Sequence, residues 1–157
     1  MNFEDFICFE AAIAQLQSSE RDNAIEELVN SLENAGKVQK NNTKSIIKAI
    51  IKRENEASTG LGRGVAIPHV KHKAVDKIIA TVGLSEQGID FFALDKLPVH
   101  SVILLVSPLD DPDMHLQAME NIFKHLQVDK FRKFLRQCRT QEQIKDLLLE
   151  ADEDPSL

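Results

Sequence analysis

The sequence has little of what several common classes of protein require. It contains only two cysteines, Cys8 and Cys138, which lie in apolar surroundings and lack the spacing of metal ligands. No His-x-x-x-His or Cys-x-x-Cys pattern is present, and no carboxylates are grouped at metal spacing, so we expect no metal site. We interpret both cysteines as free, buried thiols of a reducing compartment.

Other absences concern membranes, nucleic acids and nucleotides. No run reaches about 18 apolar residues and no signal-peptide pattern occurs, so we expect a soluble, cytoplasmic chain. The formal net charge is −6 and no basic tract occurs, which argues against nucleic acid as a partner. No Gly-Lys-Ser/Thr follows the glycines, so the sequence has no P-loop, and we expect no nucleotide and no cofactor.

What the chain does contain fits one globular domain. Its 157 residues are 43% hydrophobic, which is enough for a sizeable core. We expect a single domain over residues 1–150 and an acidic, flexible tail over 151–157.

The order of elements indicates an α/β fold, a small mixed β-sheet flanked by helices on both faces. Helices are expected to begin at Ser18/Ser19, at Asn42/Thr43, at Asp111-Pro112, near Val128 and at Thr140. Strands are expected at 65–67, 78–84 and 99–106, with shorter ones near 14–16 and 88–92. Residues 102–106 are the most apolar run, which predicts the central strand.

The candidate helix faces follow from apolar spacing. Leu116, Met119, Phe123 and Leu126 should face the core from one helix, and Phe131, Phe134, Leu135 and Cys138 from the next.

The most informative stretch is Thr59-Gly60-Leu61-Gly62-Arg63-Gly64-Val65-Ala66-Ile67-Pro68-His69. Glycine-rich backbone can expose N–H groups to an anion, and a proline before a histidine restricts the direction of the ring. Histidine titrates near neutral pH and can accept and pass on a charged group. The pattern therefore predicts a phosphoryl-accepting histidine at the end of an anion-binding loop that includes Thr59, Gly60, Gly62 and Gly64.

This stretch resembles the active-site signature of the phosphotransferase-system enzyme IIA domain of the fructose/mannitol class, which includes a nitrogen-regulatory branch. The signature begins with an acidic or amide residue, here Glu54, continues through Leu61-Gly62 and ends in Val65-Ala66-Ile67-Pro68-His69. The family then prefers a small residue, where this chain has Val70. The resemblance extends over roughly residues 10–150.

The resemblance implies roles for two further residues. Asp111-Pro112-Asp113-Met114-His115-Leu116 is similar to the family's second histidine motif, so His115 would orient or stabilise the phosphoryl group. Arg53 resembles the active-site arginine that precedes the glycine loop, and a guanidinium can bind phosphate in a bidentate manner. The plainer alternatives are a polar residue on an outer helix face for His115 and a solvated charge in Lys52-Arg53-Glu54 for Arg53. His72, His100 and His125 are expected to have ordinary structural roles.

The resemblance also implies partners. A phosphorylated histidine carrier protein would donate to His69, which would pass the group to a IIB domain or hold it as a nitrogen-type regulatory signal. The absence of IIB and IIC segments favours the stand-alone regulator. A third possibility is a protein-binding module of the same fold that is never phosphorylated.

Overall fold

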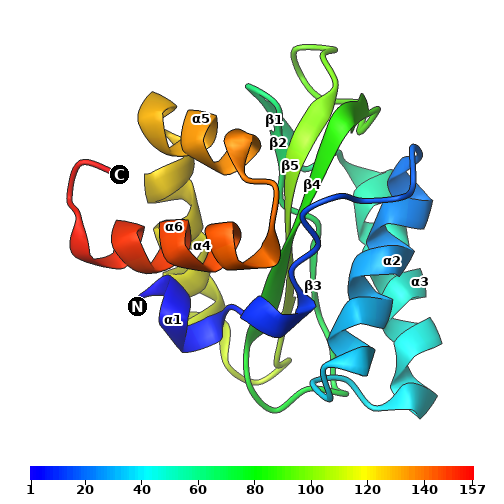
Figure 1. Cartoon of the computed structure of the whole chain (residues 1–157). Coiled ribbons are helices and arrows are strands. Elements are labelled where there is room, and N and C mark those ends of the chain that lie inside the picture. The colour runs from blue at the N-terminus through cyan, green and yellow to red at the C-terminus, as the bar shows by residue number, and fades with distance from the viewer.

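The sheet of this protein is built around β5 (Val99–Ser107), as the computed structural model of residues 1–157 shows (Figure 1). β4 (Ile79–Ile89) pairs with one edge of β5 in the antiparallel direction. β2 (Val65–Ala66) and β3 (His69–Lys71) follow one another along the other edge, both parallel to β5. β1 (Gly60–Gly62) folds back on β2 as the outer strand. The predicted central strand is confirmed.

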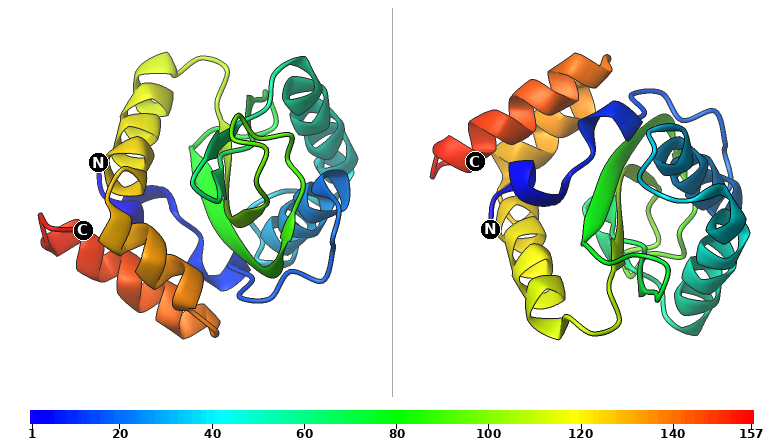
Figure 2. Two further views of the ribbon diagram at one scale, coloured as in Figure 1. Left: turned by 90° about the horizontal axis from the view of Figure 1, so that it is seen from above. Right: turned by 90° about the horizontal axis from the view of Figure 1, so that it is seen from below.

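Helices cover both faces of this sheet (Figure 2). One layer contains α2 (Arg21–Asn34) and α3 (Lys40–Glu56). The other contains α1 (Phe3–Phe6), α4 (Pro112–Leu126), α5 (Asp129–Gln137) and α6 (Gln141–Glu153), with a short 3₁₀ turn, η1 (Phe9–Ala11), after α1. Alternate residues of β5 enter the two cores: Ile103 and Leu105 pack with α4–α6, and Val102 and Leu104 with α2 and α3. The predicted α/β fold, a mixed sheet between two helical layers, is therefore confirmed.

Some helix boundaries follow the local signals and others do not. Asp111 caps α4 by accepting from the Met114 N–H at 3.2 Å, with Pro112 at the first helical position, as predicted. α2 begins at Arg21 rather than at Ser18/Ser19, because the Ser18 N–H and hydroxyl are bound by Glu27. α3 begins at Lys40, before the predicted Asn42/Thr43 cap, and the Thr43 hydroxyl donates to Glu33 of α2 instead.

Two predicted short strands were wrong. Residues 14–16 form no strand. The preceding Ile13 makes a single bridge to Gly83 of β4, and the Leu16 N–H donates to the Leu84 carbonyl at 2.8 Å. Of the residues expected to form a strand at 88–92, only Gly88 and Ile89 belong to β4, which continues past an irregular register, and Asp90 forms a single bridge. Phe92 adopts a positive φ of 54°, which turns the chain out of the sheet.

The buried face of α4 is rotated from the predicted one. Leu116 is 57% exposed, whereas Ala118, Ile122 and His125 are buried beside Leu126. The reason is aromatic packing, since the His125 ring lies 4.8 Å from the Phe3 ring, centroid to centroid. On α5, Phe134 is likewise more exposed than predicted, while Phe131 and Leu135 are buried.

Residues 151–157, which we expected to form a flexible tail, pack against the rest of the domain. α6 continues through Glu153, and Leu157 is buried. The Asp152 carboxylate accepts from the Phe3 N–H at 2.7 Å, and the Leu157 carbonyl lies 2.7 Å from Nδ1 of His125. These bonds hold the last residues on α1 and α4, so the chain ends lie near one another (Figure 1). None of the helices combines the length and apolar character needed to cross a bilayer.

Candidate functional site

His69 is the first residue of β3 and lies opposite Leu105 of β5. The pairing along this edge of β5 is interrupted at Ile67 and Pro68, between β2 and β3. The Pro68 carbonyl still accepts from the Leu105 N–H at 3.0 Å, so the backbone is anchored immediately before the histidine. The ring is half-buried at the carboxyl end of the parallel strands, which is where α/β proteins commonly bind ligands.

The His69 ring is oriented by its own backbone. Nδ1 lies 2.7 Å from the Ile67 carbonyl oxygen. Because a carbonyl can only accept, the neutral ring carries its proton on Nδ1 and leaves a lone pair on Nε2. Burial lowers the pKa of His69, the carbonyl of Ile67 opposes this, and the positive charge of Arg53 lowers the pKa further. The neutral, nucleophilic form of Nε2 is thus favoured near neutral pH.

His115 lies beside His69, as the sequence motif predicts. It belongs to the first turn of α4, and the two ring centroids are 5.6 Å apart with the planes inclined by 45°. Its Nδ1 lies 2.6 Å from the hydroxyl of Ser107, the buried last residue of β5. Burial lowers the pKa of His115, and the nearby His69 and Lys71 lower it further. The two imidazoles meet because β3 and β5 run parallel, so His69 and the turn into α4 reach the same end of the sheet.

Three charged or polar residues complete the surroundings. Arg53 donates from Nη1 to the carbonyl of Ala57 at 2.8 Å, which ties its guanidinium to the C-terminal end of α3 while its charge still acts on His69. Lys71 and Ser107 were missed from the sequence. The signals were available: strand alternation places Lys71 on the His69 side of β3, and Ser107 ends the strand before the second motif.

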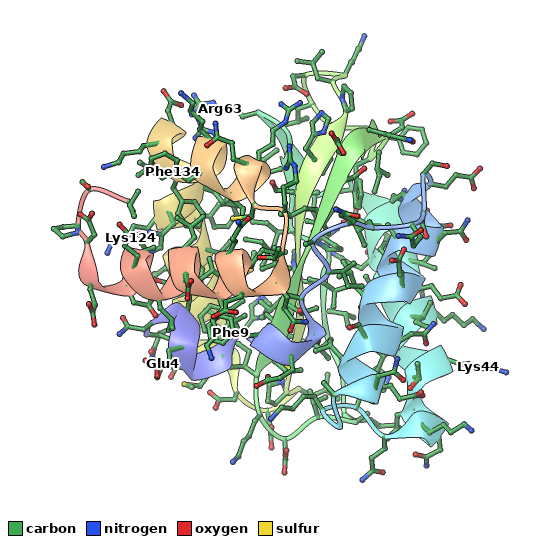
Figure 3. The ribbon with its side chains drawn as sticks, viewed as in Figure 1. Glu4, Phe9, Lys44, Arg63, Lys124 and Phe134 are labelled. Carbon is green, nitrogen blue, oxygen red and sulfur yellow. The ribbon has the colours of Figure 1, made fainter.

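The glycines of the predicted anion-binding loop lie elsewhere. Gly60, Gly62 and Gly64 form the β1–β2 hairpin, and the Gly64 carbonyl accepts from the N–H groups of His100 and Ser101 at the start of β5. His69 lies near the opposite end of that strand, and Arg63, between the glycines, lies beside α5 (Figures 1 and 3).

The N–H groups of this hairpin are also engaged locally. The Gly60 N–H donates to the hydroxyl of Ser58 at 3.0 Å, and the Arg63 N–H donates to Asp95 at 3.0 Å. Gly62 and Gly64 have φ values of 95° and 78°, so glycine serves the tight turn here. The geometry does not gather these glycines around His69.

Thr59 is the one residue of the predicted loop that remains connected to the site. Its side chain is buried, and both its N–H and its hydroxyl donate to the carboxylate of Glu54.

The remaining histidines are held by other contacts. Nε2 of His72 lies 3.0 Å from the Ser45 hydroxyl, and its Nδ1 accepts from the Ala74 N–H at 2.9 Å. Nδ1 of His100 lies 2.9 Å from the Ser85 carbonyl, and His125 is buried against the end of the chain.

The sequence was compared with protein families and with known proteins. Residues 7–151 match the model of the family described as "Phosphoenolpyruvate-dependent sugar phosphotransferase system, EIIA 2". The chain is 32% identical to the fructose-specific EIIA component of Haloferax volcanii, over 85% of each chain. It is 30% identical to the nitrogen regulatory protein of Bradyrhizobium diazoefficiens, over 94% of this chain and 95% of that one.

A third relative is much longer. The fructose-specific EIIABC component of Bacillus subtilis is 33% identical over 87% of this chain, and the chain spans only 21% of its length.

Solved structures share the fold. Nitrogen regulatory protein IIA-Ntr from Neisseria meningitidis superposes with a TM-score of 0.81 at 22% identity, covering 91% of this chain and 96% of the other. Enzyme IIAMtl of Escherichia coli, in a complex with phosphorylated enzyme IIBMtl, gives a TM-score of 0.73 at 19% identity, covering 90% and 95%.

Proposed function

The chain belongs to the EIIA 2 family of the phosphoenolpyruvate-dependent sugar phosphotransferase system, and we propose that it carries a phosphoryl group on Nε2 of His69. The observation that carries this proposal is the 2.7 Å contact between Nδ1 of His69 and the Ile67 carbonyl. That contact holds the ring proton on Nδ1 and leaves Nε2 as the nucleophile.

Phosphoryl uptake requires little covalent chemistry from the protein. The Nε2 lone pair forms a bond to phosphorus while the donor's P–N bond breaks and its electron pair returns to the donor imidazole. The Nδ1 proton of His69 stays in place throughout. Arg53 and Lys71, whose charges both act on His69, stabilise the negative charge of the transferring group.

His115 orients the phosphoryl oxygens in this proposal. Its lowered pKa keeps the ring neutral, so it contributes a hydrogen-bond donor rather than a second positive charge. If the Ser107 hydroxyl donates to Nδ1, the ring proton lies on Nε2 and can be offered to a phosphoryl oxygen. Once His69 carries the phosphoryl group, the added negative charge raises the pKa of His115 and strengthens that donor.

The donor we propose is a phosphorylated histidine carrier protein, and the acceptor is a IIB domain or a regulatory target. Support comes from the structure of a fold relative, enzyme IIAMtl, in a complex with phosphorylated enzyme IIBMtl, and from relatives named as fructose-specific and nitrogen regulatory proteins. The exchange takes place in the cytoplasm, which agrees with two buried cysteines that remain free thiols.

The alternative is a protein-binding module of the same fold that is never phosphorylated. A valine at position 70, where the family prefers a small residue, would favour it if the side chain crowded His69. Val70 instead packs against the α2/α3 core, whereas His69 faces His115 of α4. We therefore favour the phosphoryl carrier.

The test is intact-mass measurement after incubation with phosphoenolpyruvate, enzyme I and the histidine carrier protein. We expect an acid-labile gain of one phosphoryl group in the wild type and in the control His72→Ala, and none in His69→Ala. Circular dichroism should show that both variants are folded. A wild-type protein that gains no mass, or a His69→Ala variant that gains the full group, would refute the assignment.

A further inference from the structure

Glu54 is a buried carboxylate with no role in the transfer described so far. It lies in the last turn of α3 and is 2% exposed, although carboxylates are almost never fully buried without partners. Its partners are both on Thr59: the backbone N–H donates to Oε2 at 3.0 Å, and the hydroxyl donates to Oε1. The neighbouring Glu56 on the same helix end is exposed.

These bonds continue to His69 through buried backbone. The Thr59 carbonyl accepts from the Ile67 N–H at 3.3 Å. The Ile67 carbonyl in turn lies 2.7 Å from Nδ1 of His69. Thr59 and Ile67 are 5% and 1% exposed, so water does not compete for the connecting bonds. We call this series Glu54, Thr59, Ile67, His69 the Glu54–His69 hydrogen-bond chain.

We infer that Glu54 is a positioning residue, which acts through the Glu54–His69 hydrogen-bond chain to hold the Ile67 carbonyl against Nδ1 of His69. This inference rests on the proposed function of His69 as phosphoryl carrier. Ile67 lies in the gap between β2 and β3, where it has no paired residue on β5. Its N–H is instead attached to Thr59, and Thr59 is attached to Glu54.

The chemical consequence concerns the leaving group in onward transfer. The P–Nε2 bond breaks, its electron pair remains on Nε2, and phosphorus bonds to a histidine or cysteine side chain of the acceptor protein. If Nδ1 keeps its proton, His69 departs as neutral imidazole. If the Nδ1 proton is lost to solvent, His69 must depart as an imidazolate, which is a much poorer leaving group. Glu54 therefore promotes transfer without touching the phosphoryl group.

Four variants separate hydrogen bonding from charge and from general packing. Glu54→Gln keeps an acceptor for the Thr59 N–H, and the Thr59 hydroxyl can reverse to accept from the amide. Glu54→Leu removes both acceptors. Thr59→Val removes only the hydroxyl at nearly constant volume. Glu56→Gln, an exposed position on the same helix end, is the matched control for the loss of one charge.

The first readout is the tautomer of the His69 ring, measured by long-range ¹H–¹⁵N spectra of the unphosphorylated protein. The wild type, Glu54→Gln and Glu56→Gln should show predominantly Nδ1–H. Thr59→Val and Glu54→Leu should show a mixture of the two tautomers. This measurement does not depend on phosphorylation.

The second readout is single-turnover transfer from the purified phosphoprotein. Displacing a reacting group by about 1 Å costs of order 10²-fold in rate, so we expect a loss approaching that size for Glu54→Leu. We expect the transfer rate to fall about tenfold in Thr59→Val, by less in Glu54→Gln, and not at all in Glu56→Gln. If Glu54→Leu does not fold, the tautomer ratio and transfer rate of Thr59→Val decide whether the inference holds.

Wild-type tautomer ratios and transfer rates in folded Thr59→Val and Glu54→Leu would overturn the inference. A wild-type protein that is never phosphorylated would refute the proposed function instead. The tautomer measurement would still test whether the Glu54–His69 hydrogen-bond chain orients the His69 ring.

Discussion

Removing His115 should impair the release of the phosphoryl group more than its uptake. The ring lies 5.6 Å from His69, centroid to centroid, and its Nδ1 is held 2.6 Å from the Ser107 hydroxyl. One preorganised donor aimed at developing charge is worth about 10²–10³ in rate, or about 2.7–4 kcal/mol. His115→Ala should therefore take up one phosphoryl group on His69 and hand it on about 10²–10³ times more slowly.

Ser107→Ala tests whether the orientation of His115 matters. This change leaves the imidazole in place and removes one hydrogen bond, whose net worth is about 0.5–1.5 kcal/mol. The expected loss in onward transfer is about two- to tenfold.

The assay is single-turnover transfer from purified phosphoprotein to the acceptor, with uptake from the carrier protein measured separately. His100→Ala is the control, because that ring contacts the Ser85 carbonyl and belongs to the first part of β5. Unchanged onward transfer in His115→Ala, or phosphate mapped to His115 itself, would refute the reasoning.

Three further predictions concern pH, the glycine hairpin and Val70. Burial lowers the pKa of His125. As pH falls through about 6.5, His125 therefore binds a proton in the unfolded chain before it does so in the folded one. The free energy of unfolding should fall over that range. Urea titrations across this range should show a shallower dependence for His125→Gln, and parallel curves would contradict the argument. Gly62→Ala forces alanine into a φ of 95°, so the free energy of unfolding measured in urea should fall by about 1–2 kcal/mol. Phosphorylation of His69 should be unchanged. A loss of phosphoryl uptake would show that the glycine hairpin is part of the site. Val70→Ala should lower stability by about 1 kcal/mol, since the side chain packs on the α2/α3 core, while the rate of uptake stays within about twofold; a large loss of uptake would instead make Val70 part of the docking surface.

The features predicted correctly from the sequence depend on local signals. The apolar run at 102–106 could only be a short buried strand, and Asp111-Pro112 is a helix start that needs no tertiary context. His69 and His115 were recognised by motif, and the structure brings their rings together.

The features that were missed depend on contacts between distant segments. His125 is buried because Phe3 and Phe131 pack around it, and nothing near position 125 indicates that. The glycine hairpin was expected at His69, but the register of β2 on β5 places it at the other end of the strand. Glu54 was part of the recognised signature, but its bonds to Thr59 become visible only once α3 and the hairpin are placed.

The gap between β2 and β3 has a consequence for motion. β2 pairs with β5 over two residues and β3 over three, so each is a separate short ladder on a nine-residue strand. Opening β3 breaks its few bonds to β5 and removes Val70 from the α2/α3 core, while β4 stays paired with the other edge of β5. We therefore expect the segment that contains the proposed phosphoryl carrier to open locally more readily than the centre of the sheet.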